Sequence, residues 1–293
     1  MSSCLQLANT HTVGEILPPS KDDIDVEVAR ALAEDLGEGD LTAALIPEKT
    51  TISATLYSRE PAVLCGTLWF NAAFHQLDPS IKISWLYHDG EAIPTQEKLC
   101  RVTGEARAIL SGERTALNFL QLLSGTATTT HRYATLLKES GTTLLDTRKT
   151  VPGLRLSQKY AVRCGGGRNH RIGLYDMVLI KENHIAAAGS ITAAVTQARE
   201  LYQHRYKIEV EVETLDEVEE GAASGADILL LDNMDPEQLR QAVMINRHRC
   251  RLEISGSVTL ANLRSYALSG IDFISVGALT KAITPIDLSL RFD

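Results

Sequence analysis

The chain has 293 residues and an acidic balance, with a formal net charge of −8 at pH 7. Its 44% hydrophobic and 23% charged residues are typical of a globular protein with a sizeable core, and the length allows one large domain or two. The acidic balance disfavours a general nucleic-acid binder. No apolar run approaches the ~20 residues of a membrane-spanning helix.

The cysteine pattern indicates a reducing compartment. The five cysteines are odd in number, widely spaced and free of any CxxC pair, which disfavours a disulfide scaffold or a structural zinc site. The first residues lack the basic flank and apolar stretch of a secretory signal. We therefore expect a cytoplasmic protein that binds neither a membrane nor a nucleic acid.

The segment up to Thr103 mixes helical and strand patterns. Apolar residues recur at helical spacing over Ile24–Leu32, and Gly37 is suited to end that helix. A second helix is predicted around Leu68–Leu77. Alternating, β-branched and aromatic residues predict strands in TISATLYSRE, IKISWLY and LCRV. The mixture indicates a small α+β domain.

The pattern changes to regular alternation further along the chain. Two helices are predicted first, Ala106–Leu123 and Thr128–Lys138, separated by Ser124-Gly125. Six short apolar runs then alternate with amphipathic helical stretches: TLLD, MVLI, IEVEV, ILLL, RLEI and DFISV. Such an alternation is typical of a buried parallel sheet. We predict an α/β fold in which six units form an open sheet or a barrel.

Polar residues or glycines follow these apolar runs. The carboxyl ends of parallel strands converge on one face of a sheet or barrel, and binding sites are built there. We therefore expect one site that gathers the residues at these ends, which are Arg148 and Lys149, Lys181, Glu211, Asp232, Ser255 and Gly256, and Gly277.

Positive charge is concentrated in the segment from Asp146 to His184. It holds eight lysines and arginines against three acids, a net charge of +5, and leaves −13 on the rest of the chain. An acidic protein with one basic segment suggests a small, highly anionic ligand.

The side chains at the strand ends suit a phosphorylated sugar and a second anion. The planar guanidinium groups of Arg114, Arg148 and Arg171 match carboxylates or phosphates. Glu211 and Asp232 are hard oxygen ligands, better suited to Mg²⁺ or to ribose hydroxyls than to zinc. Small residues at strand ends let backbone N–H groups approach a phosphate. Together they indicate a magnesium-bound phosphorylated sugar beside an anionic partner.

Two further groups of charges have a simpler structural explanation. Arg155, Lys159 and Arg163 are spaced four apart, which predicts the solvated face of a helix. The three glutamates of Glu209–Glu213 alternate along one strand, so they point the same way. Inside a barrel they would be costly unless a metal, substrate hydroxyls or basic groups paired with them.

The run LLDTRKTVPGLRLSQKYAVRCGGGRNHRIGLYDMVLIKENHI resembles the central signature of the quinolinate phosphoribosyltransferases, or nicotinate-nucleotide pyrophosphorylases (carboxylating). EDLGEGDLT, SGERTALNFLQLLSGTAT, IEVEVETLDE, ILLLDN and LEISGSVTL also match in order. The resemblance implies an N-terminal α/β sandwich domain over residues 1–117, completed by 285–293. It also implies an incomplete α/β barrel of about six parallel strands over 118–284, and homodimers or assemblies of dimers with shared active sites.

The resemblance also implies roles for individual residues. It assigns the quinolinate pocket to Arg148, His170, Arg171 and Lys181, with Arg114 of the partner subunit. It assigns the phosphoribosyl pyrophosphate site to Lys149, Glu211, Asp232, Ser255, Gly256 and Gly277, with Mg²⁺ held by Glu211 and Asp232, directly or through water. The catalytic set is then Glu211, Asp232, Lys149 and Lys181. Arg168 stands where a small residue is expected in GGGxNHR, and it either tightens substrate binding or points outward.

The implied reaction joins quinolinate to 5-phosphoribosyl 1-pyrophosphate and gives nicotinate mononucleotide, pyrophosphate and CO₂, a step of NAD biosynthesis. Two alternatives stay open at this point. One is an enzyme of the same class that uses another acceptor, such as nicotinate. The other is a non-catalytic relative that binds phosphorylated ligands.

Overall fold

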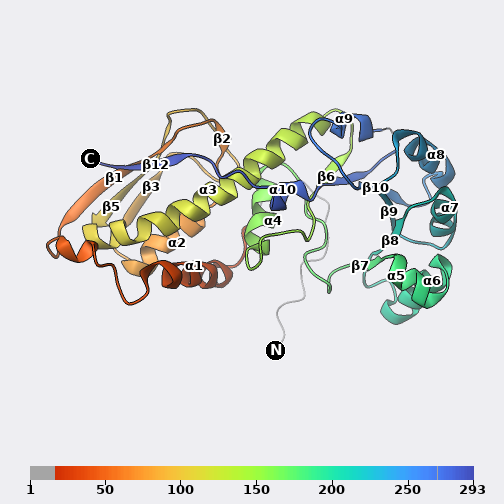
Figure 1. Cartoon of the computed structure of the whole chain (residues 1–293), viewed down its shortest axis with the longest axis horizontal. Helices are drawn as coiled ribbons and strands as arrows, with labels where there is room; N and C mark the ends of the chain where they lie inside the picture. Colours follow the sequence, from red (N-terminus) through yellow and green to blue (C-terminus); the bar gives the residue numbers. More distant parts are fainter. Residues whose placement is uncertain (1–16, 269) are drawn as a thin grey trace.

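The computed structural model describes residues 17–268 and 270–293, so the start of the chain, where no secretory signal is expected, lies outside it. Figure 1 shows two parts, one coloured red to yellow and one green to blue, with the long helix α3 (Ala106–Leu137) running from the first toward the second. None of the described helices is long and apolar enough to cross a membrane.

The first part is built on a four-stranded antiparallel sheet of order β12-β1-β5-β3. Its last strand comes from the end of the chain, where Leu290 lies opposite Leu56. The strands and helices predicted before Thr103 are confirmed, and the first helix ends where Gly37 adopts a φ of 52°. The elements are α1 (Lys21–Leu36), η1 (Ala43–Leu45), β1 (Thr51–Ser58), β2 (Ala62–Val63), α2 (Thr67–Leu77), β3 (Lys82–Trp85), β4 (Ala92–Ile93), β5 (Lys98–Glu105) and β12 (Leu288–Phe292).

Aromatic side chains fill the core of this antiparallel-sheet part. Trp69, Phe70 and Phe74 of α2 are completely buried. The Phe70 ring meets the rings of Phe74 and Trp85 edge to face, with centroids 5.0 and 5.1 Å apart. This is a packing that aromatic pairs prefer, and it fixes α2 against the sheet.

The prediction of two helices separated at Ser124-Gly125 is wrong, because α3 is continuous from Ala106 to Leu137. Both residues are small because other segments approach the helix closely. The Ser124 hydroxyl accepts a hydrogen bond from the Cys65 N–H and donates one to the Cys65 carbonyl. A Cβ atom on Gly125 would lie 2.4 Å from the Thr284 carbonyl oxygen. The pair therefore marks a packing contact in the middle of a helix.

The second part contains the six predicted parallel strands, in the order β6-β11-β10-β9-β8-β7. Within the described residues no strand pairing joins the edge strands β6 and β7, so the sheet is an open barrel. The elements are β6 (Thr143–Leu145), α4 (Arg155–Cys164), β7 (Val178–Ile180), α5 (Glu182–Ala188), α6 (Ile191–Tyr202), β8 (Ile208–Val212), α7 (Leu215–Ala223), β9 (Ile228–Asp232), α8 (Pro236–Asn246), β10 (Arg251–Ser255), α9 (Leu263–Tyr266), β11 (Phe273–Ser275) and α10 (Ala278–Lys281).

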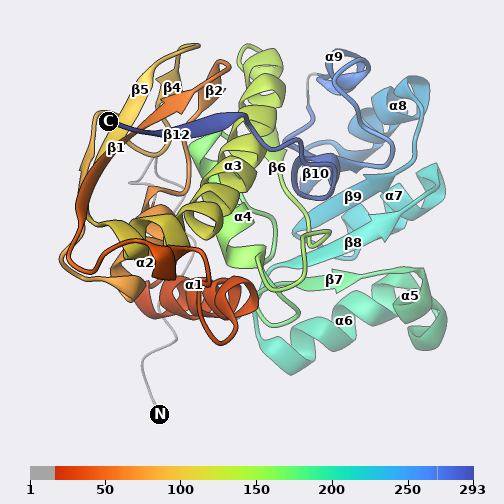
Figure 2. The same cartoon turned by 60° about the vertical axis from the view of Figure 1, so that its left-hand side comes forward.

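The two faces of this sheet carry different residues. Val210 and Val212 of β8 belong to the apolar cluster beneath the helices, which lie along the outer side in Figure 2. Since side chains alternate along a strand, Glu209 and Glu211 face the barrel interior. This alternation places buried apolar residues outside and the charged residues inside.

Candidate active site at the carboxyl ends of the parallel strands

The carboxyl ends of the parallel strands bring two predicted carboxylates together. Glu211 lies near the end of β8, and Asp232 is the last residue of the adjacent β9. One carboxylate oxygen from each, with one from Glu213, lies within 4.8 Å of the other two. Hard oxygen donors at this separation suit a cation such as Mg²⁺ or the hydroxyls of a sugar.

Lys181 links the carboxylates of Glu211 and Asp232 to the basic segment from Asp146 to His184. It directly follows β7, and its ammonium forms an ion pair with the Glu211 carboxylate. The lysine side chain is 45% exposed and the glutamate 14% exposed, so the pair is accessible from the mouth of the barrel. An anionic substrate can therefore compete for the lysine.

Two glycines in the candidate site are required by close contacts. Gly256 follows β10 with a φ of 94°, and a Cβ atom there would lie 2.2 Å from the Asn233 side-chain oxygen. Gly277 comes shortly after the end of β11, and its surroundings are less tight. A Cβ atom added there would lie 3.0 Å from the Lys149 side chain. Both positions keep backbone near the strand ends open to close approach, as a phosphate group requires.

Arg148 and Arg171 form the basic side of the site. The Nε atom of Arg148 is buried without a hydrogen-bond partner among the described residues. Burial, and then the nearby charge of Arg148, lower the pKa of the partly buried Arg171 guanidinium. Two guanidinium groups that repel each other are stabilised by an anion between them.

The segment that carries Arg171 is anchored by a buried polar network around Asp146. The Asp146 carboxylate accepts hydrogen bonds from Lys159 Nζ at 2.5 Å, from Asn169 Nδ2 at 2.6 Å and from the His170 backbone N–H at 2.9 Å. Lys159 also donates to the His170 carbonyl at 3.1 Å. Burial raises the pKa of Asp146, while Lys159 and the N–H donors oppose that shift. The network fixes the backbone beside the arginine.

The prediction that Arg155, Lys159 and Arg163 form a solvated helix face is therefore wrong. Lys159 is only 2% exposed. Arg155 donates to the Ile172 carbonyl at 3.1 Å, and Arg163 donates to the Leu17 carbonyl at 2.6 Å. The spacing correctly indicates one helix face, but that face packs against other segments of the chain.

His170 lies at the centre of a second buried cluster. Its Nε2 atom is 2.8 Å from Glu209 Oε2 and 3.6 Å from Glu253 Oε1, and its Nδ1 atom accepts the Arg171 backbone N–H at 2.8 Å. Burial alone would lower the pKa of His170, but the contact with Glu209 and the charges of both glutamates outweigh it and raise the pKa. Burial and the Glu209 charge raise the pKa of Glu253 to about 8.

Comparison with known proteins decides the family. The model of the quinolinate phosphoribosyl transferase C-terminal domain matches residues 126–291, and that of the N-terminal domain matches residues 40–124. The chain belongs to the quinolinate phosphoribosyltransferase family.

Individual relatives agree with this family over most of their length. A probable nicotinate-nucleotide pyrophosphorylase [carboxylating] of Bacillus subtilis is 39% identical, covering 88% of this chain and 89% of the relative. The chloroplastic nicotinate-nucleotide pyrophosphorylase [carboxylating] of Arabidopsis thaliana is 42% identical, covering 97% and 88%. The structure of the nicotinate-nucleotide pyrophosphorylase from Francisella tularensis superimposes with a TM-score of 0.92 at 47% identity, covering 96% of this chain and all of the other.

Arg114 is the one predicted site residue outside the parallel-sheet part of this family member. It is exposed on α3, beside Gly112, where a Cβ atom would lie 3.0 Å from the Phe74 ring. This stretch of the helix therefore packs on the antiparallel-sheet part.

Glu253 lies in the region of the candidate site, but the sequence did not lead us to predict it. It stands in the middle of β10 between the buried Leu252 and Ile254, and is itself only 1% exposed. The available signal was a single carboxylate in an apolar run, which is less conspicuous than the three alternating glutamates of Glu209–Glu213. In a buried parallel strand, such a residue points away from the apolar layer and into the barrel.

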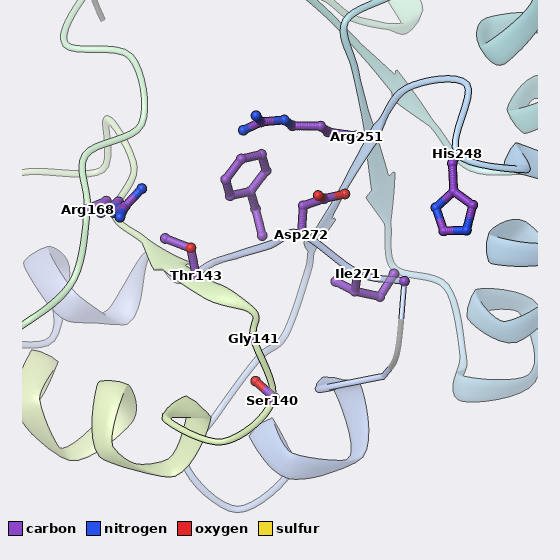
Figure 3. A pocket seen from close by; sticks show the side chains of 10 residues that line it. Ser140, Gly141, Thr143, Arg168, His248, Arg251, Ile271 and Asp272 are labelled. Carbon is purple, nitrogen blue, oxygen red and sulfur yellow. The ribbon is translucent and has the colours of Figure 1, made fainter. Parts of the chain in front are cut away.

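Arg168 is exposed and lines several hollows. One, of about 490 Å³, is also lined by Thr143, Arg251 and Phe273, the first residues of β6, β10 and β11 (Figure 3), so it lies at the amino ends of the strands. Another, of about 370 Å³, is also lined by His170 and Arg171. Arg168 therefore lies beside two residues of the predicted acceptor pocket, and both possibilities considered for it stay open.

Proposed function

We propose that the chain transfers the phosphoribosyl group of 5-phosphoribosyl 1-pyrophosphate to quinolinate, with loss of CO₂, and forms nicotinate mononucleotide and pyrophosphate. The observation that carries this proposal is the ion pair between Lys181, at the end of the basic segment, and Glu211, whose carboxylate lies beside that of Asp232. Paired guanidinium groups suit an acceptor with two carboxylates, and paired carboxylates suit a sugar or a metal.

The acceptor pocket is proposed to consist of Arg148, Arg171, Lys181 and the segment fixed by His170. A single carboxylate, as in nicotinate, would leave part of this cationic set unpaired. Quinolinate carries two adjacent carboxylates and pairs with both arginines. The half-buried Arg171 and the buried Nε of Arg148 make an unpaired state costly, which favours the dianion.

Magnesium fits the carboxylate corner of the site. Glu211 and Asp232 would hold it, with Glu213 close enough to contribute an oxygen directly or through water. When bound, the ion would offset negative charge on the departing pyrophosphate. The ion pair between Lys181 and Glu211 has to loosen for Glu211 to take that role.

The remaining residues are proposed to act by position and charge. The ring nitrogen forms a bond to C1 of the ribose as the bond from C1 to the pyrophosphate oxygen breaks, and that oxygen keeps the electron pair. Lys149 stabilises charge on the leaving group, and Glu211 offsets positive charge on the ribose. Ser255, Gly256 and Gly277 hold the 5-phosphate. The alkylated ring is a pyridinium, so the carbanion left by CO₂ lies beside a positive nitrogen before it takes a proton.

The assembly is proposed to be a homodimer, or a group of dimers, in which Arg114 of the partner subunit completes the acceptor pocket. The exposure of this arginine on α3 supports the proposal. The cytoplasmic location stays part of the same proposal and rests on the cysteine pattern.

The deciding experiment supplies quinolinate or nicotinate with phosphoribosyl pyrophosphate and Mg²⁺ and measures nucleotide formation and CO₂ release. We expect turnover and CO₂ release with quinolinate. Arg171→Ala should lower kcat/KM for quinolinate by about 100-fold, since it removes charge-assisted hydrogen bonds worth roughly 1.5–3 kcal/mol each. Arg205→Ala, an exposed arginine just before the amino end of β8, is the matched control and should stay within about twofold.

The shared site is tested with Arg114→Ala, using Arg132→Ala, exposed on the same helix, as its control. Mixing Arg114→Ala with a Lys149→Ala variant should restore activity through mixed dimers, because one of their two sites is then intact. An unchanged quinolinate kcat/KM in Arg114→Ala would remove this residue from the pocket. If nucleotide formed from nicotinate and not from quinolinate, nicotinate would be the acceptor instead.

A further inference from the structure

Two glutamates are buried inside the barrel at high energetic cost. Glu209 and Glu253 are 0% and 1% exposed, and they approach the same imidazole from neighbouring parts of the sheet. No well-aligned hydrogen bond satisfies the oxygens of either carboxylate among the described residues, although His170 Nε2 lies 2.8 Å from Glu209 Oε2. A barrel interior is normally filled by apolar side chains. Two buried acids around one histidine therefore call for a functional explanation.

The hydrogen bonds of His170 define the tautomer of its ring. Nδ1 accepts the Arg171 N–H at 2.8 Å, so this nitrogen carries no proton. The ring proton is then on Nε2, which faces Glu209 and Glu253. Both nitrogens are thus used within the protein, and the ring connects the buried acids to the backbone of Arg171.

The same arrangement argues against a metal at this cluster, although one atom from each of the three side chains lies within 4.8 Å of the others. A histidine that ligates a metal through Nε2 usually donates its Nδ1–H to an acceptor. Here the Nδ1 atom of His170 is itself the acceptor. The cluster is therefore built to hold a ring orientation.

We propose that Glu209 and Glu253 are positioning residues for the acceptor, which orient His170 and, through its Nδ1 atom, set the place of Arg171. The inference rests on the proposed function, because Arg171 is assigned there to a quinolinate carboxylate. Asp146 and Lys159 fix the backbone on one side of His170, and the two glutamates fix its ring on the other. Acting through His170, the glutamates affect the affinity for the dicarboxylate.

The test replaces Glu253 by Leu and measures steady-state kinetics with each substrate varied. We expect KM for quinolinate to rise about tenfold, because the imidazole loses its electrostatic contact with the carboxylate 3.6 Å from Nε2 and is then less firmly oriented. KM for phosphoribosyl pyrophosphate should stay within about twofold. Glu253→Gln keeps the shape and a polar group, and should recover most of the quinolinate affinity.

A double-mutant cycle with His170→Ala separates positioning from a general loss of structure. If Glu253 acts through His170, the variant with both changes should bind quinolinate no more weakly than His170→Ala alone. The matched control is Glu27→Gln, a partly buried acid that accepts hydrogen bonds from Trp69 and Ser157. It should alter stability and leave the KM for quinolinate unchanged.

Three outcomes would overturn the inference. They are an unchanged KM for quinolinate in Glu253→Leu, an equal rise in both KM values, and additive effects of Glu253→Leu and His170→Ala. If Glu253→Leu does not fold, Glu253→Asn, which is polar but shorter and cannot reach the imidazole, takes its place in the same cycle. Absence of quinolinate turnover in the unmodified protein would instead refute the proposed function, so the two failures are distinguishable.

Discussion

The two larger sheets of this protein, the antiparallel sheet of four strands and the parallel sheet of six, pack against different kinds of residue. The antiparallel sheet packs against the aromatic residues Trp69, Phe70 and Phe74, all completely buried. The parallel sheet has an apolar face beneath its helices and an inner face that carries glutamates. The charged residues that the structure describes as fully buried all belong to the parallel-sheet part, and they are Asp146, Lys159, Glu209 and Glu253.

This difference means that one part of the protein mainly contributes stability, whereas the other holds particular side chains in position. Apolar burial contributes roughly 25 cal/mol per Å² and has no direction. A buried charge costs free energy unless it is paired, and its pairing has a defined direction. The antiparallel-sheet part therefore supplies mainly packing energy, whereas the parallel-sheet part spends some stability to hold His170 and Arg171 in place.

The largest expected effect comes from removing one partner of the buried pair between Lys159 and Asp146. Lys159→Met should lower the free energy of unfolding by about 3–5 kcal/mol, because Asp146 is left as an unpaired buried charge. It should also raise KM for quinolinate, since Asp146 holds the His170 backbone. Urea unfolding and steady-state kinetics measure the two effects.

Two further variants make this result specific to the pair. Asp146→Asn combined with Lys159→Met removes both charges and should recover stability but not quinolinate affinity. Lys138→Met, on an exposed residue of the same charge, should change stability by less than about 0.5 kcal/mol. A loss below about 1 kcal/mol in Lys159→Met would contradict the assignment of a buried charge pair.

A somewhat smaller effect is expected in the antiparallel sheet. Leu56 of β1 is completely buried, and Leu56→Ala should cost about 3 kcal/mol of unfolding free energy through lost apolar contacts and the cavity left behind. Both KM values should stay unchanged, as measured on folded protein well below the unfolding temperature. A selective rise in KM for quinolinate would break the proposed division between the two sheets.

The effect that is smallest over a single step, here one pH unit, is a pH dependence from Glu253. Its pKa is about 8 in the folded protein and near 4.5 when unfolded, so between these values the folded state binds one more proton. The free energy of unfolding should therefore fall as pH rises from 5 to 8, by up to about 1.4 kcal/mol per pH unit, and the slope should vanish above 8. Glu253→Gln should lack this slope in urea unfolding at pH 5, 6, 7 and 8. If the free energy of unfolding fell equally with pH in both proteins, the Glu253 carboxyl group would not be protonated in the folded state.

Much of the fold follows from local patterns in the sequence. The six parallel strands are confirmed because the periodicity of apolar residues is a local property. The break expected at Ser124-Gly125 is wrong because small residues in a helix can reflect a neighbour, here the Thr284 carbonyl. The prediction of a solvated helix face on α4 is wrong for the same reason. The spacing along the sequence shows which residues share a face with Lys159, but it does not show which segments cover that face.

The sequence by itself determined the class of fold, the family and the group of cations and carboxylates at the strand ends. These depend on residue type, order and spacing along the chain. Only the tertiary structure decided which charges are buried and which groups they meet. The contact of Glu253 with His170 joins residues 83 positions apart on separate elements, and such a contact forms only when the sheet curves. Burial then sets the cost of each charge, so its role depends on neighbours that folding supplies.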